Sequence, residues 1–131
     1  MRITIPVSAG ELVDKITILK VKAARLSAAE KLKNVRHELL LLEGVMAESL
    51  PVSHQLSELA LLLQSVNARL WDIEDAKRSC ERSSDFGPQF VALARQVYKL
   101  NDERAGLKRQ INILVGSELI EEKSHAIGET S

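Results

Sequence analysis

The sequence predicts an all-α protein: an antiparallel helical bundle built on a long hairpin of its last two helices, with a short N-terminal strand. Leucine supplies most of the packing residues, because aromatic residues make up only 3% of the chain. Apolar residues recur every three or four positions, the period of a helix with one buried face. Three prolines, Pro6, Pro51 and Pro88, lie where helices are expected to begin or end. A chain of 131 residues is expected to form one domain, 1–131.

The first predicted element is a short strand over residues 1–8. Ile3, Ile5 and Val7 alternate with their neighbours, which is the two-residue period of a strand. A single strand needs a partner for its backbone groups. Two partners are open: residues 118–127 near the C-terminus, or the same segment of a second copy.

Ser8 and Glu11 have the spacing of a capping box and predict a helix that runs to about residue 26. Its main apolar stripe points one way, while Ile18 and Val21 point the other way. This helix is therefore predicted to be apolar on two sides. The stripe consists of Leu12, Ile16, Leu19 and Ala23.

Ser27 and Glu30 form a second predicted capping box, which starts a helix that ends before Pro51. Leu40 and Leu41 are apolar residues outside the main stripe of this helix. The stripe consists of Leu32, Val35, Leu39, Leu42 and Met46.

Two longer helices complete the bundle, the first from about residue 53 to 81 and the second ending at about residue 115. Asp85 is the predicted N-cap of the last helix, with Pro88 in its first turn, and Gly116 is the predicted C-terminal cap. The short connection predicts an antiparallel hairpin of these helices. Residues 117–131 form a C-terminal tail.

The last helix carries polar residues along its apolar side. They lie at or near the face that also holds Leu100, Leu107 and Ile111, and an unpaired charge in that position would be costly. The preceding helix offers a matching flank of Asn67, Glu74 and Arg78. The polar residues of the last helix are Asn101, Arg104, Lys108 and Asn112.

Two interpretations of this cluster are open. In the first, it is a structural layer that fixes the register of the hairpin, with Glu74 the first choice of partner for Arg104 and Asp14 or Asp75 as substitutes. In the second, the cluster binds a small anionic ligand, a carboxylate or phosphate. The candidate ligand-binding residues are Asn67, Glu74, Asn101, Arg104, Lys108 and Asn112.

The remaining apolar surface predicts a homodimer. It exceeds what one four-helix bundle can bury, and symmetric self-association is the commonest way to cover such a surface. The candidate interface residues are Ile18, Val21, Leu40, Leu41, Leu61 and Trp71.

Composition argues against several classes of function. Lys plus Arg and Asp plus Glu both number 18, so there is no excess of positive charge for nucleic-acid binding. The single cysteine, Cys80, indicates a reducing compartment, and neither a signal peptide nor a membrane span is expected, so a cytoplasmic location is predicted. The three histidines are scattered, no metal or cofactor site is indicated, and catalytic residues cannot be assigned.

Four segments together resemble a small, uncharacterised bacterial family of helical proteins described as a domain of unknown function. The resemblance spans nearly the whole chain and implies a bacterial cytoplasmic helical protein, without implying an activity or a cofactor. The segments are GELVDKITIL (10–19), LWDIED (70–75), ARQVYKLNDERAGLKRQIN (94–112) and GSELIEEKS (116–124).

A looser resemblance is to the all-helical chorismate mutases, whose first helix carries an aspartate and, about three turns later, an arginine. Asp14 and Arg25 are similar to this pair, but their spacing differs by one residue, which turns Arg25 away from the main apolar stripe, and Asp14 shares that outward direction. A non-enzymatic interaction or scaffold protein is therefore the leading prediction, with a possible protein partner. An anion-binding protein or an enzyme with a site like that of chorismate mutase is the alternative.

Overall fold

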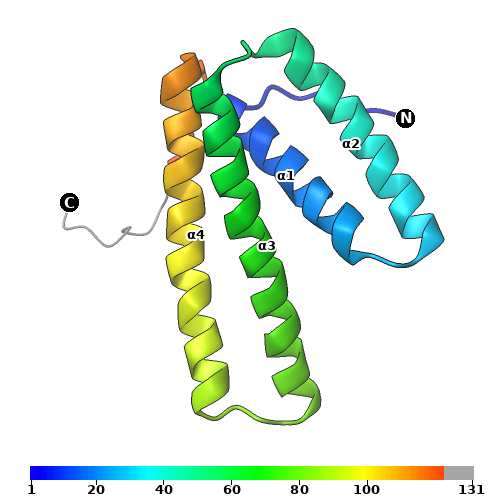
Figure 1. Ribbon diagram of the computed structural model, residues 1–131, viewed down its shortest axis with the longest axis vertical. Helices are drawn as coiled ribbons and strands as arrows, with labels where there is room; N and C mark the ends of the chain where they lie inside the picture. Colours follow the sequence, from blue (N-terminus) through cyan, green and yellow to red (C-terminus); the bar gives the residue numbers. More distant parts are fainter. Residues whose placement is uncertain (123–131) are drawn as a thin grey trace, which may run out of the picture.

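The computed structural model describes residues 1–122, which contain four α-helices and no strand (Figure 1). The prediction of an all-α protein is therefore confirmed. No helix among the described residues combines the length and the apolar composition that crossing a membrane would require. The helices are α1 (Ala9–Arg25), α2 (Ala29–Ser49), α3 (His54–Arg82) and α4 (Pro88–Val115).

Helices α3 and α4 form the long antiparallel hairpin that the sequence predicts (Figure 1). Val66, Ile73 and Leu100 are buried between them. Half-buried apolar side chains complete this core, namely Leu70, Leu93, Val97 and Leu107. The end of the hairpin that carries the turn extends beyond the part covered by α1 (Figure 1).

Helix α1 lies between the hairpin and α2, and it contacts all three other helices, whereas α2 contacts only α1 (Figure 1). Ala9 and Val13 of α1 share a core with residues of α3 and α4. This position explains why α1 is apolar on two sides. It also corrects one interface prediction, because Val21 is buried within the chain. The partners in that core are Leu56, Leu63 and Ile111.

The N-terminal cap of α1 forms only in part as predicted. Ser8 Oγ accepts a hydrogen bond from the backbone N–H of Glu11 at 3.0 Å. The carboxylate of Glu11 does not return to Ser8 as a capping box requires, because it pairs with Lys108 on α4 instead.

Two other predicted helix starts are wrong. The N-cap of α2 is Ala28, without a side-chain hydrogen bond, so Ser27 does not cap this helix. The N-cap of α4 is Gly87, and Asp85 accepts a hydrogen bond from the N–H of Gly87 at 3.1 Å. The C-terminal end of α4 is as predicted, because Gly116 adopts the left-handed conformation with a φ of 66°.

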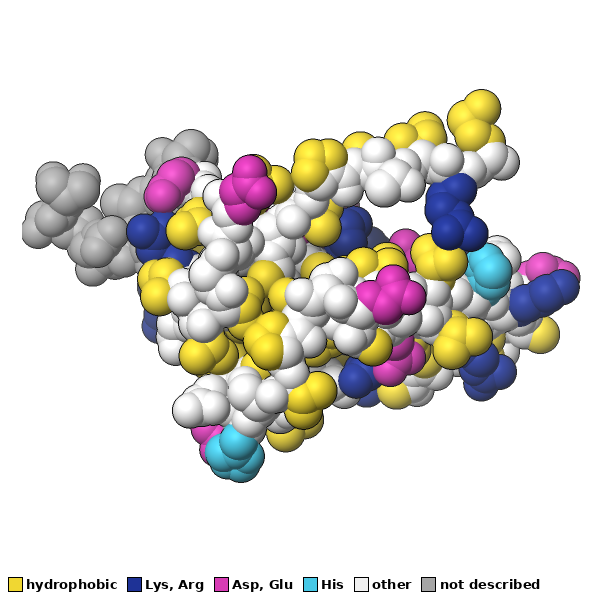
Figure 2. Space-filling model, turned by 90° about the horizontal axis from the view of Figure 1, so that it is seen from above, with side chains coloured by type: hydrophobic (Ala, Val, Ile, Leu, Met, Phe, Trp, Pro, Cys, Tyr) yellow, Lys and Arg dark blue, Asp and Glu magenta, His cyan; other side chains and the backbone are white. Residues whose placement is uncertain are grey.

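The predicted N-terminal strand is not present among residues 1–122. Residues 1–7, which we call the arm, leave the start of α1 and pass α2, and they form neither a helix nor a strand (Figure 1). Figure 2 shows the arm projecting from the body of the molecule with an opening beneath it. One predicted partner of the arm, residues 118–127, lies partly outside the described residues, as does His125.

Candidate functional site

The polar residues of α4 face α1, and they meet α1 in antiparallel order. Each of three successive polar positions on α4 bonds to a residue near the start of α1. Because the order is reversed between the two chain segments, the contacts fix both the direction and the register of the two helices. The three pairs are Gly10 with Asn112, Glu11 with Lys108, and Asp14 with Arg104.

Asp14 joins three helices. Arg104 donates from Nε to Oδ1 of Asp14 at 2.9 Å and from Nη2 to Oδ2 at 2.6 Å, a bidentate pair. Asn67 of α3 donates from Nδ2 to Asp14 Oδ1 at 3.0 Å and to Thr17 Oγ1 at 2.9 Å. The side chain of Asp14 is 1% exposed and that of Arg104 is 31% exposed, so the carboxylate is the buried member of the ion pair.

The surroundings of Asp14 keep it ionised. Burial raises the pKa of this carboxyl group, but hydrogen bonds from Arg104 and Asn67 and the charges of Arg104 and Lys108 outweigh burial and lower the pKa below its ordinary value. The hydrogen bond to Asp14 is also the main reason that the pKa of Arg104 is raised. A charge pair of this kind is typical of a structural contact rather than of a general base near neutral pH.

The start of α1 approaches α4 closely at Gly10. Asn112 Oδ1 accepts a hydrogen bond from the N–H of Gly10 at 2.7 Å. A Cβ atom at position 10 would collide with the carbonyl oxygen of Lys108, so only glycine fits. Lys108 Nζ bonds Glu11 Oε2 at 2.7 Å on the same turn of α1. We call this set the docking cluster: Gly10, Glu11, Asp14, Thr17, Asn67, Arg104, Lys108 and Asn112.

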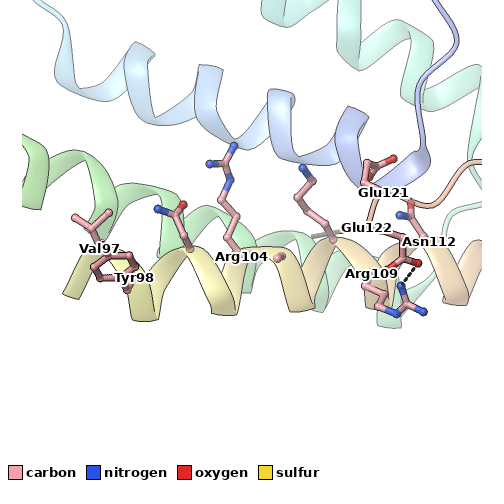
Figure 3. A pocket seen from close by; sticks show the side chains of 10 residues that line it. Val97, Tyr98, Arg104, Arg109, Asn112, Glu121 and Glu122 are labelled. Atoms are coloured by element: carbon pink, nitrogen blue, oxygen red, sulfur yellow. Dashed lines mark hydrogen bonds and ion pairs between the residues drawn. The ribbon is translucent and has the colours of Figure 1, made fainter. Parts of the chain in front are cut away.

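A pocket of about 500 Å³ lies along α4 beside the docking cluster (Figure 3). We call it the α4 pocket. Val97 and Tyr98 lie at one end, and Arg109, Glu121 and Glu122 lie at the other (Figure 3). The other lining residues are Asn101, Arg104, Ala105, Lys108 and Asn112.

The segment that follows α4 folds back and lines the charged end of the α4 pocket. Ser117 Oγ accepts a hydrogen bond from the N–H of Ala9 at 3.1 Å, and Ser8 Oγ donates to Glu121 Oε1 at 2.7 Å. Arg109 Nη1 bonds Glu122 Oε1 at 3.0 Å (Figure 3). The pocket is thus bounded by α4 and by a segment held to the start of α1.

A smaller pocket of about 260 Å³ is lined by residues of α1 and α3 and by Arg104. Trp71 and Glu74 line it, with Ile18 and Val21 from α1. Glu74 interacts with Lys77 at 3.4 Å rather than with Arg104.

The six predicted ligand-binding residues separate into two groups. Asn67, Arg104, Lys108 and Asn112 converge on α1, whereas Asn101 and Glu74 lie outside the docking cluster. The first choice of partner for Arg104, Glu74, is therefore wrong, and the substitute Asp14 takes this place. Whether any of the six binds a ligand stays a prediction.

The predicted outward direction of Asp14 is also wrong, since Asp14 is fully buried. Arg25 lies away from it, on the surface, where Nε and Nη2 bond the carboxylate of Asp72 at 3.1 and 3.2 Å. Asp14 and Arg25, the pair similar to that of the chorismate mutases, therefore do not lie in one site. Among residues 1–122, no group of three or more His, Cys, Asp and Glu side chains is placed to hold a metal ion.

Sequence reasoning missed the contributions of Gly10, Glu11 and Thr17. A signal was available, because Glu11 and Asp14 are three residues apart on one helix while Arg104 and Lys108 are four apart on another. Two such pairs of opposite charge can meet when the helices run antiparallel. The sequence gives no indication that these two helices are neighbours, so the signal has meaning only once the fold is known.

The fold and the docking cluster define a small four-helix protein whose first helix is bonded to its last by polar contacts at a buried interface. The chain belongs to the family of unknown function DUF6165, whose model matches residues 1–130. This confirms the resemblance to an uncharacterised family. No curated protein and no solved structure matches the chain.

Proposed function

We propose that this protein is a non-enzymatic interaction protein that works as a homodimer, and that the arm of each copy binds the other copy. The observation that carries the proposal is that the arm exposes apolar side chains and makes no hydrogen bonds to the described chain. Ile3 and Ile5 are 78% and 65% exposed, and they alternate with Thr4 as in a strand. Within residues 1–122, no hydrogen bond joins the arm to the rest of the chain.

A second copy fits the arm for a geometric reason. An extended segment satisfies its backbone groups on a neighbouring strand, and residues 1–122 contain no strand that could serve. Two arms related by a two-fold axis pair antiparallel with one another and place the same residues in the interface on both sides. Ile3 and Ile5 of the two copies then share one face of the ribbon.

Helix α2 supplies a surface on which such a ribbon could rest. A two-stranded ribbon alone is marginally stable in water and needs an apolar support. No residue of α2 is buried, and Leu40 is 73% exposed while Val45 is also exposed. The arm passes this helix (Figure 1).

Exposed apolar side chains on the described residues are available for an interface. A stable dimer buries about 800 Å² of surface on each partner. Of the predicted interface residues, Leu40 and Leu61 are exposed, and Ile18, Leu41 and Trp71 are half-buried.

The docking cluster supports the same proposal. Every buried side-chain nitrogen and oxygen atom of the described residues has a hydrogen-bond partner. Arg104, Lys108 and Asn112 on the inner face of α4 each bond a residue of α1. These contacts are consistent with a partner that binds elsewhere on the surface, namely a second copy of the chain.

The experiment is sedimentation equilibrium of the full chain at micromolar concentration, where we expect the mass of a dimer. The variant Ile3→Lys/Ile5→Lys should be a monomer, because two charges on the shared face oppose pairing. The matched control is Thr4→Lys, which lies on the opposite side of the same strand and should remain dimeric. A monomeric wild-type protein, or equal loss of the dimer in Thr4→Lys, would contradict the proposal.

A further inference from the structure

The α4 pocket contains hydrogen-bond donors that the docking cluster does not use. Arg104 bonds Asp14 through Nε and Nη2, and its Nη1 makes no hydrogen bond within residues 1–122. Lys108 Nζ has three protons and one acceptor, Glu11. The side-chain amide of Asn101 makes no hydrogen bond within the same residues. All three residues line the α4 pocket, and Figure 3 shows Arg104 among its lining side chains.

Carboxylates already lie at the charged end of this pocket. Glu122 accepts a hydrogen bond from Arg109 at 3.0 Å, and Glu121 lines the pocket next to it. Both members of the Arg109–Glu122 pair are well exposed to solvent, with side-chain exposures of 51% and 77%. An exposed ion pair of this kind is weak, so an external carboxylate can compete with Glu122 for Arg109.

The charges of the pocket define the anion that fits. Arg104 is balanced by Asp14 and Lys108 by Glu11, and both acidic partners are held in the docking cluster. When Glu122 leaves, Arg109 is the one lining cation that loses its acidic partner. One carboxylate restores the balance, whereas a doubly charged phosphate would leave an excess of negative charge beside Glu11 and Asp14.

The other end of the pocket is suited to an apolar group. Val97 and Tyr98 lie at this end, and Ala105, which also lines the pocket, has a small side chain. The volume of about 500 Å³ is in the range of pockets that bind small molecules. An aromatic or branched aliphatic group next to a carboxylate matches both ends.

From this geometry we infer that the α4 pocket binds a small monocarboxylate with an apolar or aromatic body. The carboxylate replaces that of Glu122 on Arg109, the donors of Lys108 and Asn101 orient the ligand, and its body lies against Val97 and Tyr98. The segment that carries Glu121 and Glu122 acts as a competitor for the site within the same chain. This binding site is separate from the arm and does not depend on the proposed homodimer.

The test is a titration of the full chain with 3-phenylpropionate, followed by calorimetry and by the chemical shifts of Tyr98. We expect binding of the acid, and no binding of the neutral amide 3-phenylpropanamide at the same concentrations. Inorganic phosphate should bind more weakly than the acid. A site that prefers the amide or phosphate, or one that binds none of the three, would overturn the inference.

Two variants test the role of the charges. Arg109→Gln should weaken binding of 3-phenylpropionate by about tenfold or more, the usual effect of losing a hydrogen bond to a charged group. Glu122→Gln should strengthen it by about two- to fivefold, because an exposed competing ion pair is removed.

Two matched controls have the same charge changes outside the pocket. Arg95→Gln, on the exposed surface of α4, and Glu118→Gln, in the segment after it, should bind like the wild-type protein. Binding that is unchanged in Arg109→Gln, or weakened equally in Arg95→Gln, would show that the carboxylate is not held in the α4 pocket.

Discussion

Helices α1 and α2 lie side by side and are both rich in leucine and other aliphatic residues, yet they are held in different ways. Nine of the 17 residues of α1 are buried, and none of the 21 residues of α2 is buried. Helix α1 carries Asp14 and Thr17 in its buried face and contacts every other helix. Helix α2 has an apolar stripe of regular spacing but rests on α1 alone. A leucine stripe predicts that a helix forms, whereas the matched polar residues determine where α1 binds.

The largest change in the free energy of unfolding should follow when the ion pair between Asp14 and Arg104 is broken. Arg104→Met leaves the carboxylate of Asp14 buried without its cation, and we expect a loss of about 3–5 kcal/mol in the free energy of unfolding. Asp14→Asn should cost less, because Arg104 is 31% exposed and can reach water. Chemical denaturation of the full chain measures both effects.

Two further variants test whether the pair or the charge is responsible. The double substitution Asp14→Leu/Arg104→Met removes both charges and should be much closer to wild type than Arg104→Met alone. Glu74→Leu is the control, since Glu74 is the partner that the sequence suggested, and it should change stability by no more than about 0.5 kcal/mol. An Arg104→Met protein as stable as wild type would show that α1 is not held by this pair.

Acid should weaken the Asp14–Arg104 ion pair, and the loss of stability should be smaller than in Arg104→Met. The pKa of Asp14 is lowered in the folded protein, so the unfolded chain binds the proton more readily. The stability that the pair contributes is present above the ordinary pKa of 3.8 and is lost as the pH falls below it through the pKa of the folded state. Denaturation midpoints between pH 7 and pH 3 should decrease more in wild type than in Asp14→Asn. Equal decreases would contradict this assignment.

The close approach of α1 to α4 predicts a smaller loss at Gly10. Gly10→Ala places a Cβ atom against the carbonyl oxygen of Lys108, and because backbone atoms cannot move aside freely, the helices must separate slightly. We expect a loss of about 1–3 kcal/mol in the free energy of unfolding, as for other overpacked sites. A thermal denaturation midpoint equal to that of wild type would show that α1 tolerates a shift at this point.

The smallest change in stability should be a gain, produced by replacing a glycine in α2. Nothing lies within 4 Å of a Cβ atom built at Gly44, and Gly44 is inside the helix. Gly44→Ala should therefore stabilise the protein by about 0.5–1 kcal/mol, because alanine loses less conformational entropy in a helix than glycine does. If Gly44→Ala were as harmful as Gly10→Ala, α2 would be packed against a surface absent from this chain, such as that of a second copy.

The number and type of the elements could be predicted from sequence, because helices are determined largely by local patterns. The spacing of leucines predicts four helices. Ser8 and Gly116 lie at the helix ends that they predict, and α3 begins close to residue 53, as expected. Local patterns were less reliable where two residues could serve as the cap. Ser27 and Asp85 are good capping residues, but the chain begins the helices one or two residues later.

The partners within the docking cluster could not be predicted from sequence in the same way. A helical wheel places Arg104 and Lys108 on the inner face, which is correct, but it does not say which helix lies opposite. Glu74 was the natural choice because its helix is the neighbour in sequence. The structure places α1 there instead, so Asp14 and Glu11 become the partners. The α4 pocket could not be predicted from sequence either, because Glu121 and Glu122 line it only after the chain turns back at the end of α4.

The docking cluster also has a consequence for the order of folding during synthesis. Asp14 and Arg104 are 90 residues apart, so at about 5–20 residues per second α1 waits roughly 5–20 s for its main partner to be made. During this time only α2 is available to cover α1, on one of its two apolar sides. We expect the hairpin to form first through its local contacts and α1 to join last, so that substitutions at Asp14 accelerate unfolding and leave the folding rate nearly unchanged. The pair that fixes the native register would then be a late event in folding, and the exposed second side of α1 would be the surface that a nascent chain most needs to protect.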